Sequence, residues 1–75
     1  MTQQQVIEFL EEILEVEAGS IQAEQSLDDI DEWDSVAALS FAVGLDEFFG
    51  KPIKVSDIAS CSTVKDLIGI ALGDE

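Results

Sequence analysis

Apolar residues near the start of the chain recur with the period of an α-helix, and this pattern constrains the fold more than any other feature. They fall at positions i, i+1, i+4, i+7 and i+8 on one face: Val6, Ile7, Leu10, Ile13 and Leu14. The remaining face is acidic: Glu8, Glu11, Glu12 and Glu15, with Phe9 as an apolar exception near the boundary. Thr2 and Gln5 predict a capping box, and Gly19 and Ser20 end the pattern. An amphipathic helix therefore opens the chain.

The segment from Ser20 to Asp34 lacks helical periodicity and is rich in acidic residues and Ser. Isolated apolar residues are spaced along it: Ile21, Leu27, Ile30 and Trp33. A loop of this length inside a small domain is uncommon and is usually functional or disordered. The spaced apolar residues favour an ordered loop that is held to the core.

A second helix is predicted from Asp34 or Ser35 to about Phe49. Asp34 is a favourable N-cap, and Trp33 before it can lean on Ala38 as a weak hydrophobic staple. Gly, which follows Phe49, is a favourable residue after a helix end, and the Pro two positions later prevents continuation. Ser35 is then the first helical residue, with its hydroxyl free in solvent.

Two shorter elements complete the predicted fold. Ser56 is a candidate cap for a brief helix at residues 57–59, and Thr63 with Asp66 predicts a capping box for the last helix. The last helix is expected to bury four residues: Val64, Leu67, Ile68 and Ala71. No segment has the pattern of a strand. The fold class is therefore all-α, a small four-helix bundle with a short third helix and a long first loop, in one domain over residues 1–75.

Composition excludes several functions. The 75 residues include 17 Asp and Glu against three Lys and Arg, a net charge of -14, and such a surface is repelled by nucleic acid and anionic lipid. No His and a single Cys leave neither the commonest general base nor a disulfide or thiolate zinc site. The longest uncharged stretch, which includes Val36 to Leu45, is too short to span a bilayer, and the N-terminus lacks the features of a signal peptide. A non-catalytic cytoplasmic protein without membrane insertion is expected.

The second predicted helix has two apolar stripes. One runs along its whole length and suits the core: Ala38, Phe41, Ala42, Leu45, Phe48 and Phe49. Val36, Leu39 and Val43 form a shorter stripe that stops at Asp46 and Glu47. Because a small bundle has difficulty burying both, the shorter stripe is predicted to be an exposed surface for a partner. Burial of Val36 and Leu39 under the preceding loop is the alternative.

The tetrapeptide Trp33-Asp34-Ser35-Val36, at the start of the second helix, resembles the Asp-Ser-Leu motif of the acyl carrier protein family. The likeness extends over nearly the whole chain. It includes the amphipathic first helix, residues 26–29 of the loop, residues 48–50 at the end of the second helix, and residues 63–67 at the start of the last.

The resemblance implies a function and its residues. Ser35 would bear a 4′-phosphopantetheine arm from coenzyme A, and Asp34 would lie beside the metal of the phosphopantetheinyl transferase that attaches it. The arm would carry acyl or aminoacyl thioesters between loading and processing enzymes of fatty-acid, polyketide or related biosynthesis. Basic docking patches on these enzymes would meet a monomeric carrier at five residues: Val36, Leu39, Val43, Asp46 and Glu47.

The sequence departs from the best-known fatty-acid carriers at Ala37 and Ser40, where those carriers have acidic docking residues, and at Val36, which replaces Leu. A specialised freestanding carrier is therefore at least as consistent with the sequence as a housekeeping one. Ser35 as an ordinary N-cap residue stays open, as does an unmodified acidic interaction domain that uses the shorter apolar stripe.

Metal and thiol chemistry are weaker interpretations. The acidic run from Asp28 to Asp34 fails the EF-hand template, so no metal site is predicted. Cys61 is expected to be buried or half-buried, without the electropositive surroundings that a reactive thiol needs.

Overall fold

The computed structural model describes residues 2–73. Its elements, in order, are α1 (Gln3–Leu14), a 3-10 turn η1 (Leu27–Asp29), α2 (Ser35–Phe49), α3 (Val55–Ala59) and α4 (Val64–Leu72). Within these residues the extended pairing is a single isolated antiparallel bridge between Ser26 and Thr63. The predicted all-α fold with four helices and a long first loop is confirmed.

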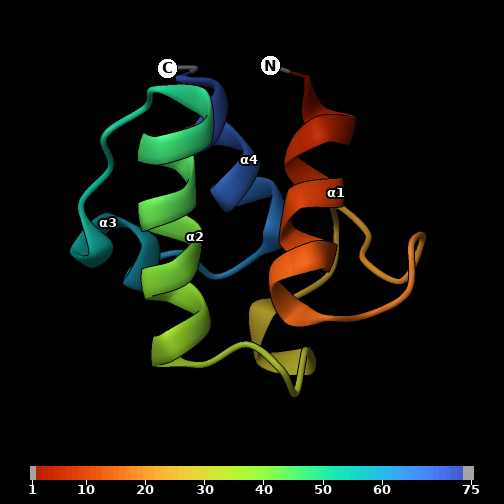
Figure 1. Cartoon of the computed structure of the whole chain (residues 1–75). Coiled ribbons are helices and arrows are strands. Elements are labelled where there is room, and N and C mark those ends of the chain that lie inside the picture. Colours follow the sequence, from red (N-terminus) through yellow and green to blue (C-terminus); the bar gives the residue numbers. More distant parts are fainter. Residues whose placement is uncertain (1, 74–75) are drawn as a thin grey trace.

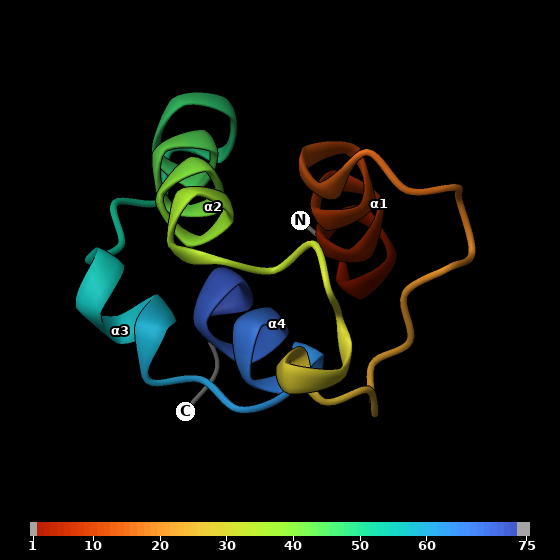
Figure 2. The same ribbon diagram turned by 90° about the horizontal axis from the view of Figure 1, so that it is seen from below.

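Helices α1 and α2 run antiparallel (Figure 1), and α4 lies beneath both in the view of Figure 2. Helix α1 contacts both α2 and α4, while the short α3 packs along α2. The fully buried side chains come from every helix: Val6, Leu10, Phe41, Leu45, Ile58, Val64 and Leu67. Within residues 2–73, no helix combines the length and apolar character that crossing a bilayer requires.

Helix α1 begins as predicted and ends earlier than the sequence pattern indicated. Gln5 N–H donates to the Thr2 hydroxyl and Thr2 N–H donates to the Gln5 side chain, which confirms the capping box. The helix ends at Leu14, ahead of Gly19 and Ser20, because Glu15 adopts the left-handed conformation at φ 59°. Val16 N–H then donates to the Glu11 carbonyl, a bond that closes the helix end.

Glu11 is buried, although the helical pattern placed it on the solvent face of α1. It is 4% exposed, and its carboxylate accepts hydrogen bonds from Gly19 N–H at 2.9 Å and from Ile21 N–H at 3.1 Å. A buried carboxylate needs such donors. The start of the long loop is therefore folded back onto α1.

The second half of the loop is fixed to the start of α4. Leu27 N–H donates to the Ser62 carbonyl at 2.9 Å, and Val64 N–H donates to the Gln25 carbonyl at 3.0 Å. The apolar residues Ile21, Leu27 and Ile30 are buried in the core and Trp33 is half-buried, which confirms the prediction of an ordered loop.

Two sequence predictions about the C-terminal half are wrong. Ser56 does not cap α3, since that helix starts at Val55 and has no side-chain cap. Phe48 does not join the core, because on the last turn of α2 its side chain points largely into solvent and meets the Phe9 ring of α1 only edge to face. Helix α2 ends at Phe49 with Gly50 left-handed, and the predicted capping box and buried residues of α4 are present.

Candidate functional site

The start of α2 is organised by Asp34. Its backbone is extended, its Oδ1 accepts a hydrogen bond from Ala37 N–H at 2.9 Å, and its carbonyl accepts one from Ala38 N–H at 2.9 Å. This is the predicted N-cap geometry, in which the carboxylate faces the positive end of the helix dipole. The carboxylate is thus held at the helix end, immediately before Ser35.

Ser35 is the first residue of α2, and it is exposed as predicted. Its hydroxyl makes no hydrogen bond to any residue in the range 2–73, so no local structural role occupies it. A helix N-terminus favours a negatively charged group placed on its first residue, by about 0.3–1 kcal/mol at an exposed site. The geometry therefore suits a modified hydroxyl better than a capping one, because Asp34 already performs the capping.

Trp33 anchors the approach to this site. Its indole lies 6.3 Å from the ring of Phe41, edge to face, and the backbone N–H of Trp33 donates to the Ile30 carbonyl. The sequence predicted a staple against Ala38, and the aromatic contact with Phe41 is the interaction that the structure shows. The residue before Asp34 is therefore fixed to the core of α2.

The shorter apolar stripe of α2 is exposed. Val36, Leu39 and Val43 are 71%, 51% and 46% accessible, which excludes their burial under the loop. Val43, Asp46 and Glu47 line a shallow depression of about 220 Å³ between α2 and residues 52–55. The structure thus brings three of the five predicted docking residues together at the C-terminal half of α2, whereas Leu39 and Val36 lie outside this depression, nearer Ser35.

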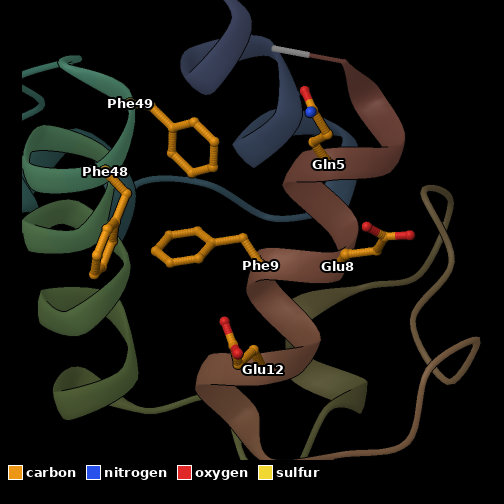
Figure 3. A pocket seen from close by; sticks show the side chains of 6 residues that line it. All are labelled: Gln5, Glu8, Phe9, Glu12, Phe48 and Phe49. Atoms are coloured by element: carbon orange, nitrogen blue, oxygen red, sulfur yellow. The ribbon is translucent and has the colours of Figure 1, made fainter.

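A cluster of aromatic rings between α1 and α2 was not foreseen from the sequence. Phe9 lies at its centre, with ring centroids 5.8 Å from Phe41, 6.1 Å from Phe48 and 5.4 Å from Phe49. Figure 3 shows the Phe9 side chain reaching from α1 toward the two C-terminal phenylalanines of α2. Two residues of the sequence could have indicated this cluster: Phe9, an aromatic residue at the boundary of the apolar face of α1, and Gly44, a glycine on the inner side of α2.

Cys61 is half-buried, as predicted, and its surroundings oppose ionisation. Burial raises the pKa of the thiol, and the carboxylates of Asp66 and Asp57 raise the same pKa further. Within residues 2–73, no group of three metal-ligating side chains is placed to hold an ion. The start of α2 is thus the best-formed candidate site.

The sequence model of the family described as "Phosphopantetheine attachment site" matches residues 4–70. The chain belongs to this family. The fold is similar to the solution NMR structure of holo acyl carrier protein from Geobacter metallireducens, with a TM-score of 0.79. The two sequences are 19% identical, and the match covers 97% of this chain and 84% of that one. No curated protein sequence matches the chain.

Membership confirms the resemblance to acyl carrier proteins. Members of this family are carriers of a phosphopantetheine prosthetic group and are not themselves catalysts. The chain is accordingly a phosphopantetheine carrier protein and not an enzyme. The residues at the start of α2 fit such a group, since they offer a free hydroxyl beside a helix N-terminus.

Proposed function

We propose that Ser35 bears the 4′-phosphopantetheine arm and that the protein carries acyl or aminoacyl thioesters between enzymes. The observation that supports Ser35 is its position as an exposed first residue of α2, relieved of capping by the neighbouring Asp34. The arm supplies a terminal thiol for thioester chemistry. This chain supplies a fixed attachment point, a helix dipole that favours the phosphodiester, and a surface that enzymes recognise.

We also propose a role for Asp34 when the arm is attached to Ser35. Its Oδ1 faces Ala37 N–H, and its other carboxylate oxygen has no hydrogen-bond partner among the described residues. We infer that this second oxygen approaches the metal of the phosphopantetheinyl transferase, which takes the arm from coenzyme A. The exposed acidic residues just before the site, Asp31 and Glu32, add negative potential that attracts a basic partner.

The docking surface proposed for acyl-loading and acyl-processing enzymes is the exposed side of α2. Val36, Leu39 and Val43 provide apolar contacts, and Asp46 and Glu47 provide charge for basic patches. The early part of α2 carries Ala37 and Ser40 and no acidic residue before Asp46, which supports a specialised biosynthetic pathway as the setting. The proposed carrier is a cytoplasmic monomer.

Intact mass measurement after incubation with coenzyme A and a broad-specificity transferase tests the attachment site. The wild type should gain one phosphopantetheine group, and Ser35→Ala should gain none. Ser40→Ala is the matched control, because Ser40 is an exposed serine on the same helix. Modification of Ser35→Ala to the wild-type extent would refute the assignment.

The docking surface is tested with the partner enzymes by Leu39→Asp. This change should lower partner turnover while helicity stays nearly unchanged, because Leu39 is half exposed. Loss of the fold instead would show that Leu39 supports the core. A chain that accepts no arm under any condition would leave an unmodified acidic interaction domain as the function.

A further inference from the structure

Two adjoining depressions lie on the face shared by α1 and α2. One, of about 450 Å³, is lined by Gln5, Glu8, Phe9, Glu12, Phe48 and Phe49 (Figure 3). The other, of about 360 Å³, is lined by Phe9, Ile13, Leu39, Ser40, Val43, Gly44, Glu47 and Phe48. Because Phe9 and Phe48 line both, the two depressions form one surface, here called the aromatic groove.

The aromatic groove exposes apolar surface that the fold does not need. Phe48 is 72% accessible, and its ring makes an edge contact with Phe9 while most of it faces solvent. Gly44 keeps the floor of the groove low, since a Cβ at this position would overlap the Phe9 ring. A large aromatic side chain left outside the core, beside a hollow of side-chain size, is typical of a protein-binding surface.

The charges around the groove select its occupant. Glu8 and Glu12 lie on its α1 side and Glu47 on its α2 side, while none of the three lysines of the chain lines either depression. A second copy of the chain would bring another net charge of -14 to this acidic rim, and anionic lipid or nucleic acid would be repelled as well. The complementary occupant is apolar in the middle and cationic at its edges.

We propose that the aromatic groove docks an amphipathic segment of a partner protein, in which aromatic or long aliphatic anchors are flanked by Lys or Arg. The anchors pack against Phe9 and Phe48, and the basic residues pair with Glu8, Glu12 and Glu47. This mode matches helix-in-groove recognition, which uses a few apolar anchors from one helical face.

The groove is separate from the start of α2. Val36 lines neither depression, and Phe48 follows it by twelve residues, which corresponds to about 18 Å along a helix. A partner can therefore occupy the groove while Ser35 stays accessible. Binding in the groove requires no phosphopantetheine arm, so the inference stands independently of the proposed attachment at Ser35.

The test uses Ser35→Ala protein, so that failure of docking and failure of arm attachment are measured separately. Three synthetic helical peptides of the same length are compared. The first is basic, with Trp and Leu anchors and Lys at its polar positions. The second has Glu in place of Lys, and the third keeps Lys but has Ser in place of the anchors. Backbone amide shifts in NMR titrations at physiological salt report where and how tightly each binds.

The basic anchored peptide should shift the amides of Phe9, Gly44 and Phe48, and the other two peptides should bind at least about tenfold more weakly.

Phe48→Asp should lower the affinity of the protein for the basic anchored peptide about thirtyfold, the loss expected for a central anchor. Val55→Asp is the matched control, because it makes the same kind of change at an exposed apolar position that lines neither depression. The affinity of this control variant for the basic anchored peptide should stay within about twofold of that of the Ser35→Ala protein. Glu8→Lys combined with Glu12→Lys should reverse the preference toward the acidic peptide.

Several outcomes would overturn the proposal. These are absence of binding by the basic anchored peptide, equal binding by the Ser-substituted peptide, or a greater loss from Val55→Asp than from Phe48→Asp. Self-association that Phe48→Asp abolishes would identify a second copy as the occupant. If decanoate shifted the same amides to an equal extent, the occupant of the groove would be a hydrocarbon chain and not a partner protein. Circular dichroism confirms that each variant remains folded.

Discussion

The ring of Phe9 lies against Gly44 so closely that a Cβ on Gly44 would overlap the end of the ring. This contact joins α1 to the middle of α2, and it sets how deep the groove between the two helices can be. The same ring also contacts Phe41, which is fully buried, and Phe48, which is mostly exposed. Phe9 is therefore the side chain that connects the core to the surface.

Replacement of Gly44 by Ala should have opposite effects in two backgrounds. Ala in place of Gly in a helix interior contributes about 1 kcal/mol of stability, whereas displacing a packed ring costs about 1–3 kcal/mol. Gly44→Ala should therefore lower the free energy of unfolding of the wild type by about 1 kcal/mol and raise that of Phe9→Ala by about 1 kcal/mol. Urea unfolding of the four proteins measures this coupling. Gly69→Ala is the control, since a Cβ there meets nothing within 4 Å and should stabilise the protein. Equal effects of Gly44→Ala in both backgrounds would contradict the proposed contact.

Glu11→Ala should destabilise the protein by about 2 kcal/mol, because it leaves the buried N–H of Ile21 and the part-buried N–H of Gly19 without an acceptor. Hydrogen exchange at the amides of Gly19 and Ile21 should accelerate at the same time. Glu12→Ala, at the exposed neighbouring position, should change stability by less than about 0.5 kcal/mol. If the two variants were equally stable, the carboxylate of Glu11 would not hold the loop.

The stability of the capping box of α4 should depend on pH. Hydrogen bonds from the backbone N–H groups of Ser62 and Thr63 lower the pKa of Asp66 below its ordinary value of 3.8. Because the folded pKa is depressed, the ionised carboxylate stabilises the fold fully above pH 3.8, and this contribution is lost as the pH falls through the folded value. The stability difference between the wild type and Asp66→Asn, measured by urea unfolding, should therefore shrink as the pH falls below 4, about the unfolded value. A difference that stays constant across this range would show that the carboxylate does not titrate with folding.

Cys61 should react slowly with iodoacetamide. Burial, followed by the charges of Asp66 and Asp57, raises the pKa of this thiol and lowers the thiolate fraction at neutral pH. The alkylation rate at pH 8 should be below that of free cysteine and should rise in Asp57→Asn, which removes one of the two charges. An alkylation rate above that of free cysteine would contradict this account. Mass spectrometry of quenched samples gives the rates.

Much of the fold follows from patterns that act over short distances in the chain. The capping boxes at Thr2 and Thr63, the N-cap at Asp34 and the left-handed Gly50 each depend on residues within one or two helical turns. The exposed stripe of α2 was also predictable, because it concerns how many apolar faces a small bundle can bury. These features locate the candidate site at the start of α2.

The features that the sequence did not reveal depend on contacts between distant elements. A helical wheel places Glu11 among the solvent-facing glutamates, and its burial results from the loop folding back over it. The wheel places Phe48 on the inner side of α2, but its side chain is largely exposed and contacts the Phe9 ring of α1 edge to face. The early end of α1 was missed for a different, local reason, since Glu15 adopts a left-handed conformation that most residues of its type avoid.

The hydrogen bonds between the long loop and the start of α4 determine when the loop can become ordered during synthesis. Ala23 and Leu27 precede Ser35, yet their backbone partners are Lys65 and Ser62, far later in the chain. A chain emerging N-terminus first exposes Ser35 well before these partners exist, so the loop leading into α2 has nothing to pair with at that stage. An enzyme that recognises the ordered loop would consequently find it formed only after residues 62–65 have been synthesised.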